Sequence, residues 1–578
     1  MPTPPPARRS TVTLAILTAA VAGGATGCVR TPATAPFEPR AMQARQLDVG
    51  ADRPARQAAL EDSPLDEGVL DVRELVARAA RNADGTTRPD TRPAPAEIEL
   101  SLADCVRLAT VNNHDVRVAA FGPAIEETRV IEAEARFDPT FQQRLEFQYS
   151  DQQITNLAGA LAGPSIVNDL QRTYASSTSL TQPLGNGGEA SLTYGVTYLD
   201  AQGNFDRGLT DTPETWQSSL TLRFTQPLLR DFGTDVNRAR IVVNRNNQRV
   251  EVLTFRSQIE ETVLSVERAY WQLYAAGRQV EVQRDLLRRT IEASQRIEER
   301  LEIDVDNGQV AQALGGVYDR RVALIQAEAR VADLSTQLKL LIADPDLPVA
   351  GPTLLVPTSE PVAQPLLFDK AESIESALLY RPELAQQVVR VASSEAALAV
   401  GRNGVLPRLD FVVTGGIQGL DDNFGGAIEN QFGFDGFTAG AGIQLEIPLG
   451  NRAARSVLAR ALLQRLQAIA EYGRLIDSIS AEVDIALRRV ETSYAVLLES
   501  RKRSAASEEQ VRVSDNLEQN ADRLDAAFVD RRLRYLSELA NAQSNEAAAL
   551  ADFNAALAEF ERAKGTLLRY NNIVLGEE

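Results

Sequence analysis

The sequence predicts a mostly α-helical fold with a minority of β-strands, built from two copies of one plan. The first observation is a heptad repeat, in which apolar residues recur at every seventh position of two long stretches. The first stretch carries Ile259, Val266, Leu273, Val280, Leu287 and Leu301, with Ser294 in its gap; the second carries Ile476, Val483, Val490, Leu497 and Val511, with Ser504 in its gap. A repeat of this period is typical of coiled coils.

The second observation is an alternation of polar and apolar residues in short segments near Gly-rich turns, which predicts β-strands. The five segments are Thr140–Tyr149, Ala190–Tyr198, Trp216–Phe224, Leu409–Gly416 and Phe437–Ile447. No segment after the N-terminus has 18 uncharged apolar residues, so a mature protein that crosses a membrane must do so with strands. Trp216, Tyr149, Tyr194 and Tyr198 would then lie near the membrane interfaces, or line the lumen if the register is the other one.

The third observation is the position of the prolines, which reveals a duplication. Pro139 and Pro407 precede the first strand of each copy, and Pro227 and Pro448 follow the last. From the second proline to the next turn-like break, at Asn307 and near Asp530, the distances are about 80 and 82 residues. Each would be a helix of roughly 120 Å. The returning segments are about half as long, and Ile98–Arg136 and Ile374–Asn403 have the length needed to cover the other half.

These patterns predict the following boundaries. The first structural repeat is 97–345, with strands at about 139–227 and a helical hairpin at about 233–343 whose tip is near 307. A linker at 346–368 precedes the second repeat at 369–573, with strands at about 407–448 and a hairpin at about 450–572 whose tip is near 530.

The N-terminus predicts export. Arg8 and Arg9 precede an apolar run that ends in small residues and Cys28, which is the order of a secretory signal at 1–28. Cys28 also fits a bacterial lipobox, in which the thiol is acylated, although Ala25 stands where that motif usually has Leu. The alternative is an ordinary cleavage site with an incidental cysteine. The Pro-rich stretch 29–96 indicates a tether.

Composition argues against several function classes. The formal net charge of −19 disfavours nucleic-acid binding, which needs a basic face. With 1 His and 2 Cys, the chain lacks the ligands for a Cys/His zinc site. We therefore expect no metal, no cofactor and no catalytic residue. Cys105 is expected to be a small apolar helix residue and His114 a structural one.

At this point the chain resembles the TolC-like outer-membrane efflux protein family, possibly of lipoprotein type, over roughly Glu97 to Asn572. The segments that carry the resemblance are SLADCVRLATVNNHDVRVAA, ESALLYRPELAQQ, QPLLRDFG at Gln226–Gly233, and RYLSELANAQSNEAAA. It implies a homotrimer whose strands form one outer-membrane β-barrel, continued by a long periplasmic α-helical coiled-coil barrel. The usual barrel has four strands per chain and twelve in all. The first copy has about 47 residues more than the second between its prolines, enough for a further hairpin at Ala175–Leu184 and Ala190–Asp200. Six strands per chain would give eighteen, and twelve is slightly favoured.

The resemblance also implies a function and its sites. The chain would be the exit duct of a tripartite efflux pump or type I secretion system, opened by a periplasmic adaptor (membrane fusion) protein and energised by a proton-driven or ABC inner-membrane transporter. The tips at Asn307, Gly308, Asp530 and Arg531 would contact the adaptor. Glu538, with Asn541 in the neutral second place, would ring the periplasmic entrance. Three copies would total −57, which favours cationic cargo. The alternative is a structural or adhesive trimeric spacer.

Overall fold

The computed structural model describes residues 96–156, 165–203, 214–299, 307–520 and 526–573. The predicted signal, Cys28 and the tether lie outside these residues. The chain divides into two units, residues 1–91 with 348–352 and residues 92–347 with 353–578. Every helix and strand named below belongs to the second unit.

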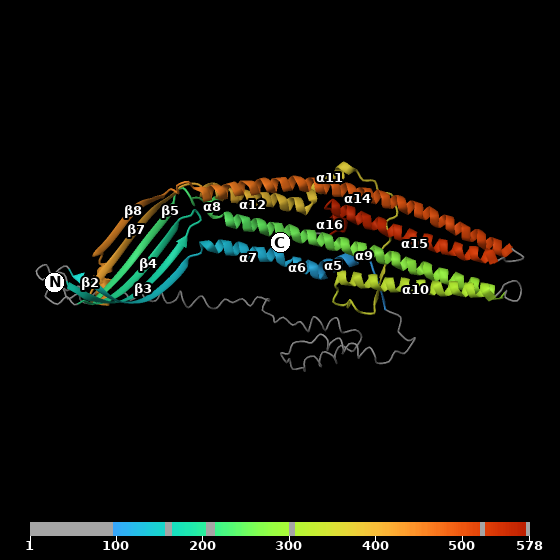
Figure 1. Ribbon diagram of the computed structural model, residues 1–578, viewed down its shortest axis with the longest axis horizontal. Helices are drawn as coiled ribbons and strands as arrows, with labels where there is room; N and C mark the ends of the chain where they lie inside the picture. The colour runs from blue at the N-terminus through green and yellow to red at the C-terminus, as the bar shows by residue number, and fades with distance from the viewer. Residues whose placement is uncertain (1–95, 157–164, 204–213, 300–306, 521–525, 574–578) are drawn as a thin grey trace, which may run out of the picture. The chain divides into compact units, whose positions relative to one another are not determined.

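One end of this unit is a six-stranded antiparallel sheet in the order β2-β3-β4-β5-β7-β8 (Figure 1). Its strands are β2 (Thr140–Asn156), β3 (Ser165–Pro183), β4 (Glu189–Gly203), β5 (Thr215–Pro227), β7 (Arg408–Asp421) and β8 (Gly436–Glu446). The slight preference for four strands per chain is therefore wrong, and the further hairpin is β3–β4. The preference failed because β3 is rich in Ser and Thr, so that its alternation of polar and apolar residues is weak.

The helices follow the predicted order of each copy. The first copy contains α5 (Leu102–Asn112), α6 (His114–Ala119), α7 (Phe121–Glu134), η2 (Ala135–Phe137), α8 (Thr234–Asn237), α9 (Ala239–Glu299) and α10 (Asn307–Ile342). The second contains α11 (Lys370–Tyr380), α12 (Pro382–Gly404), α13 (Phe424–Phe432), α14 (Arg452–Asn520), α15 (Ala526–Ala563) and α16 (Leu567–Tyr570). Two short strands, β1 (Glu97–Leu100) and β6 (Leu354–Pro357), pair in parallel.

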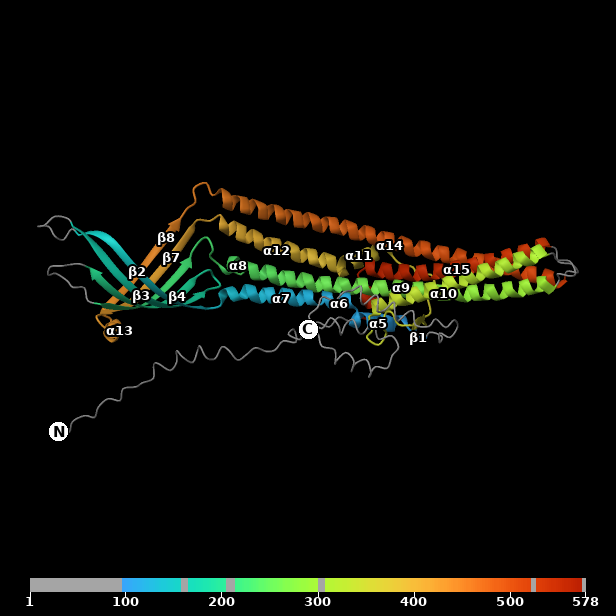
Figure 2. The same cartoon turned by 60° about the horizontal axis from the view of Figure 1, so that its bottom comes forward.

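Each long helix is covered along its length by two shorter ones, as the duplication predicts (Figures 1 and 2). On α9, the half near the sheet packs against α7, where Asn244 donates to the Arg129 carbonyl at 2.9 Å. The other half packs against α10, where Arg284 pairs with Glu328 at 2.8 Å. On α14, α12 and α15 take the same two places, with Glu395 paired to Arg465 at 2.9 Å and Glu546 to Arg501 at 3.6 Å.

The heptad residues form the seams between these helices. Ile259, Val266, Leu273 and Val280 on α9 are buried, as are Val483, Val490, Leu497 and Val511 on α14. Farther along α9 the buried leucine is Leu286 rather than the heptad residue Leu287, which is half-buried. A helix of 3.6 residues per turn drifts against a seven-residue repeat, which accounts for this change.

The second tip lies several residues earlier than predicted. Helix α14 ends at Asn520 and α15 begins at Ala526, so Asp530 and Arg531 are inside a helix. The segment Phe528-Val529-Asp530 contains neither Gly nor Pro, and nothing in it disfavours the helix. The first tip is closer to its predicted position, since α10 begins at Asn307.

A buried acid joins α9 to the C-terminal segment. Glu267 is 2% exposed and accepts a hydrogen bond from the Asn571 side-chain nitrogen at 2.7 Å. Burial raises the pKa of the Glu267 carboxyl to about 7, because the charged form is poorly solvated there. The folded chain therefore holds this proton more tightly than the unfolded chain does.

We predict that the free energy of unfolding falls as the pH rises from about 4.5 to 7, since the folded state must then ionise Glu267 against its raised pKa. Glu267→Gln should leave stability at pH 5 unchanged and raise it at pH 8, by a few kcal/mol at most. Thermal unfolding at both pH values checks this. The exposed α9 residue Glu292 supplies the control, since Glu292→Gln makes the same substitution at an exposed position of the same helix. A Glu267→Gln variant less stable than the parent at pH 8 would contradict the prediction.

Candidate functional site

The two faces of the sheet differ in chemistry. Strand register places Phe141 beside Leu180, Leu180 beside Leu192 and Leu192 beside Leu222, all on one face. The same face continues through Val413, Ala441, Phe411, Ile443, Leu409 and Leu445 on β7 and β8. The opposite face carries mostly Ser, Thr and Gln. Examples are Ser177 and Ser179 on β3, Thr193 on β4 and Thr221 on β5. The sheet therefore has one mainly apolar face and one polar face, with Ser176 and Thr178 of β3 as polar residues on the apolar face.

An aromatic row crosses the apolar face. Adjacent rings of Phe147, Tyr174, Tyr198 and Trp216 have centroids 4.8, 5.9 and 4.8 Å apart, and Trp216 meets Phe424 of α13 at 5.4 Å. Beyond this row, on the same face, Arg172 pairs with Asp200 at 3.3 Å. The change from aromatic to charged side chains marks one limit of the apolar band. Tyr149, Tyr194, Tyr198 and Trp216 thus all lie on the apolar face of the sheet.

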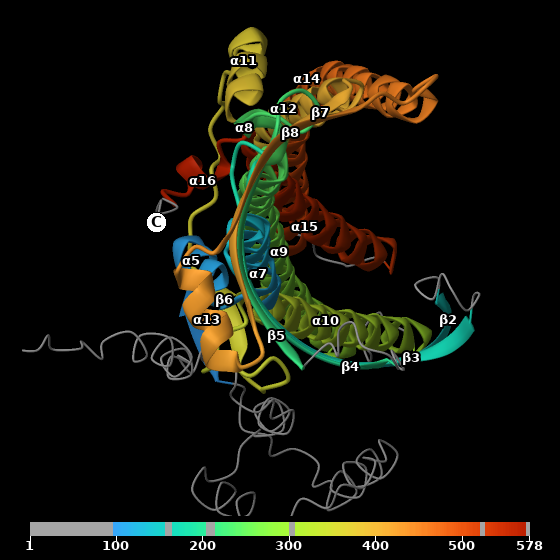
Figure 3. The same cartoon turned by 90° about the vertical axis from the view of Figure 1, so that its left-hand side faces the viewer.

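Helix α13, which the sequence did not predict, lies on the apolar, convex side of the sheet (Figure 3). The buried Ser218 hydroxyl donates to the Ala427 carbonyl at 2.8 Å. Gly419 permits this approach, because a Cβ there would lie 2.0 Å from the same carbonyl oxygen. Asn423 caps the helix by accepting from the Gly426 amide at 2.8 Å. This Asn cap is the sequence signal that could have identified the helix.

The turn of the β3–β4 hairpin is fixed to the junction between sheet and helices. Asn186 donates from its side chain to Gln226 at 3.0 Å and accepts from the Gly233 amide through its carbonyl at 3.0 Å. Gly187 has a φ of +92°, and a Cβ there would lie 2.1 Å from the Asp231 carbonyl oxygen. The junctions of the two copies also meet, since the Leu228 amide donates to the Leu409 carbonyl at 2.7 Å.

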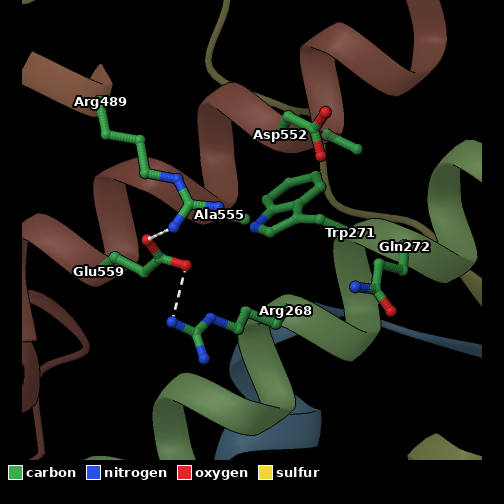
Figure 4. A pocket seen from close by; sticks show the side chains of 8 residues that line it. Arg268, Trp271, Gln272, Arg489, Asp552, Ala555 and Glu559 are labelled. Atoms are coloured by element: carbon green, nitrogen blue, oxygen red, sulfur yellow. Dashed lines mark ion pairs between the residues drawn. The ribbon is translucent and has the colours of Figure 1, made fainter. Parts of the chain in front are cut away.

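Halfway along the helices, ion pairs hold three long helices together. Glu559 of α15 lies between Arg268 of α9 and Arg489 of α14, 2.6 Å from each (Figure 4). These residues line a hollow of about 330 Å³ beside Trp271. The buried Arg381 guanidinium binds Glu482 at 2.7 Å, and Arg562 binds the same carboxylate at 2.9 Å. Sequence reasoning missed this network, because its members are far apart in the chain and follow no motif.

At the far end of the helices, the predicted entrance residues lie on α15. Glu538 is half-buried and Asn541 is exposed, within a segment whose inner side packs through Leu536, Leu539 and Ala540 against Leu286 and Val511. Arg320 of α10 donates to the Ser537 hydroxyl, next to Glu538. This contact joins the two hairpins. Arg531 is exposed and adjoins Arg532, which pairs with Asp515 of α14 at 3.1 Å.

The remaining predicted residues take structural positions. Cys105 is fully buried on α5, where burial raises the pKa of its thiol to about 12. His114 begins α6 directly after Asn113, whose side chain caps that helix. Within the described ranges, no group of three or more His, Cys, Asp or Glu side chains is arranged to hold a metal ion. No described helix has the length and apolar character required to cross a membrane.

Comparison of the sequence with protein-family models and with curated proteins gives no match. Solved structures do match. The Campylobacter jejuni CmeC outer membrane channel is 13% identical, with a TM-score of 0.57 over 81% of this chain and 86% of that one. The Vibrio cholerae outer membrane protein VceC is 14% identical, with a TM-score of 0.55 over 80% and 96%. The open state of the Neisseria gonorrhoeae MtrE outer membrane channel is 15% identical, with a TM-score of 0.53 over 81% and 89%. The chain therefore has the fold of the TolC-like outer-membrane channels.

Proposed function

We propose that the protein is an outer-membrane channel that serves as the exit duct of a tripartite efflux pump or type I secretion system. The observation that carries the proposal is the two-faced sheet. Its apolar face suits lipid, and its Ser, Thr and Gln face suits a water-filled lumen. The fold likeness to outer-membrane channels supports the same function. The duct needs no catalytic group or cofactor, because an inner-membrane transporter of proton-driven or ABC type supplies the energy.

The proposed assembly is a homotrimer in the outer membrane whose helices extend into the periplasm. The two helical tips, at Asn307 and Gly308 and at the start of α15, would receive the adaptor protein. Asp530 and Arg531 remain adaptor-contact candidates, now on the first turns of α15. Glu538 would contribute one carboxylate per copy to a ring at the entrance, and Asn541 a neutral amide.

The second candidate function is a structural or adhesive trimeric spacer. The long coiled-coil seams of α9 and α14 favour it, because they would stiffen a spacer as well as a duct. The two functions differ in the lumen: a spacer would be plugged, whereas a duct conducts ions.

Planar-bilayer recording tests the function. We expect purified wild-type protein to show small ohmic conductance steps and Arg320→Ala to show larger ones, because the variant loses the contact with Ser537 that joins the two hairpins. A spacer would conduct in neither form. If no conductance appears in either protein while both insert and remain oligomeric, the duct is excluded and the spacer is favoured.

Glu538→Gln tests the entrance. We expect the cation-to-anion permeability ratio, from reversal potentials in a salt gradient, to fall about twofold or more, because each copy loses one carboxylate of the ring. The control is Glu546→Gln on the same helix, since Glu546 is already paired with Arg501. Equal ratios in wild type and Glu538→Gln would place the selectivity elsewhere.

Labelling with radioactive palmitate tests the lipid anchor. We propose that Cys28 is acylated, and we expect the wild-type protein to incorporate label and Cys28→Ala to incorporate none. In this proposal the strands hold the protein in the membrane, so the variant should still reach the outer membrane without the lipid. Unlabelled wild-type protein would mean that Cys28 marks an ordinary cleavage site.

A further inference from the structure

The six-stranded sheet has two open edges. β2 and β8 each pair with one neighbour, so one side of each strand carries N–H and C=O groups that pair with no other described strand. Residues 140–148 of β2 and 437–446 of β8 are exposed throughout. An open edge in lipid leaves these groups unsatisfied at a cost of several kcal/mol each. The inference rests on the proposed function in two respects: it takes the apolar face of the sheet to lie in lipid, and it takes the assembly to be a homotrimer.

We propose that β8 of one copy pairs with β2 of the next, so that three copies close an eighteen-stranded barrel. The direction of the strands permits it. In an antiparallel sheet of six strands the first and the last run in opposite directions, so a β8–β2 pair between copies continues the alternation. The sheet also bends into an arc when viewed from its outer end (Figure 3). A closed barrel removes every edge.

Strand register supports a specific pairing. A path across the sheet, perpendicular to the strands, leads from Thr140 on β2 to Gly440 on β8; it passes through Thr181, Ser191, Arg223 and Thr414. Gly440 is six residues from Glu446, the end of β8 at the helical side. If the rims of neighbouring copies are level, Glu446 pairs with Thr140, and each copy shifts the register by about six residues. Three copies shift it by about eighteen, equal to the number of strands, which corresponds to a tilt of about 36°. This tilt is within the range of known barrels.

The same pairing matches the faces of the two strands. It brings Leu445 beside Phe141, Ala441 beside Leu145 and Ala439 beside Phe147, and all six side chains belong to the apolar face. A shift of one residue would place apolar side chains beside polar ones. Two of the pairs combine a small with a large residue, since Ala441 and Ala439 of β8 lie opposite Leu145 and Phe147 of β2. The glycines of β8 belong to the polar face, where Gly440 and Gly442 would lie opposite Glu146 and Arg144. Glycines in a strand are typical of positions where another backbone approaches.

The β3–β4 hairpin explains why six strands suit this chain. Four helices, α7, α9, α12 and α14, lead to or from the sheet, and at about 9 Å each they occupy roughly 36 Å of circumference. Six strands about 4.8 Å apart and tilted by about 36° also occupy roughly 36 Å, whereas four would occupy roughly 24 Å. The hairpin therefore makes the membrane barrel as wide as the helical barrel beneath it. Its turn is fixed at that junction by Asn186.

Cysteine cross-linking in the full chain tests the pairing. The double variant Ala441→Cys/Leu145→Cys should form covalent dimers and trimers on oxidation, in most of the protein. Each single variant controls for Cys28 and for the buried Cys105. Ala441→Cys/Glu146→Cys is the matched control for register, because its side chains point to opposite faces and should cross-link at most weakly. Leu192→Cys/Leu222→Cys should close a bond within one chain, since these residues are neighbours on β4 and β5.

The outcomes are distinct. Covalent trimers from Ala441→Cys/Leu145→Cys together with the internal β4–β5 bond support eighteen strands, whether or not the protein conducts. Covalent trimers without the disulfide between β4 and β5 would place the β3–β4 hairpin outside the barrel. That result would overturn the inference that the hairpin widens the barrel to eighteen strands. Cross-linking of Ala441→Cys/Tyr194→Cys instead would make β4 the edge strand, with four strands per chain, and overturn the proposal. Covalent trimers without any conductance would overturn the proposed duct and leave the barrel standing.

Discussion

A strand shifted by one residue against its neighbour turns every side chain to the opposite face, so six strands keep an apolar face only if all of them share one register. In this chain the register holds from Phe141 on β2 to Leu445 on β8. It decides where the aromatic row lies and which side chains line the other face. It also decides where each strand meets its helix. The start of β2 and β7 and the end of β5 and β8 lie on the side of the sheet that faces the helices.

The segments that join the sheet to the helices fix where each helix begins. Pro227 ends β5, and Gly233, with a φ of +102°, allows the chain to turn into α8 and α9. The Asp231 amide donates to Asn403 at the end of α12, which ties the junction of one copy to that of the other. Because α9 and α12 are held there, the seam of α9 and the packing of α12 on α14 begin at fixed positions next to the sheet. The heptad seams of α9 and α14 then carry the arrangement toward the tips.

Much of this could be predicted from the sequence, because the signals are local. Prolines mark the strand ends, and the heptad repeat marks the seams between helices. The two copies share the same order and lengths of segments, so a boundary in one copy supports the matching boundary in the other. The number of strands could not be predicted from the sequence. β3 carries Ser176 and Thr178 where β4 carries Val196 and Tyr194, so its alternation of polar and apolar residues is weak. A weak alternation fits a hairpin and a loop equally well. The second tip was misplaced because Asp530 is polar but compatible with a helix. The contacts of Arg381 and Glu559 depend on which helices meet, and no local pattern contains that information.

The charge of the chain can now be assigned to a part of the fold. On the polar face of the strands, the register places the five acids Glu146, Asp169, Glu189, Asp410 and Glu446 and the three bases Arg144, Arg223 and Arg408, a net charge of −2. In the proposed duct, the membrane part of the lumen would therefore add little to the −19 of the whole chain. A preference of that duct for cations would then arise in its helical part, where a few carboxylates could act at short range in a confined space. Glu559 would contribute little there, because two arginines already neutralise it. Glu538 takes part in no ion pair among the described residues, so its charge would remain available to ions at the proposed entrance.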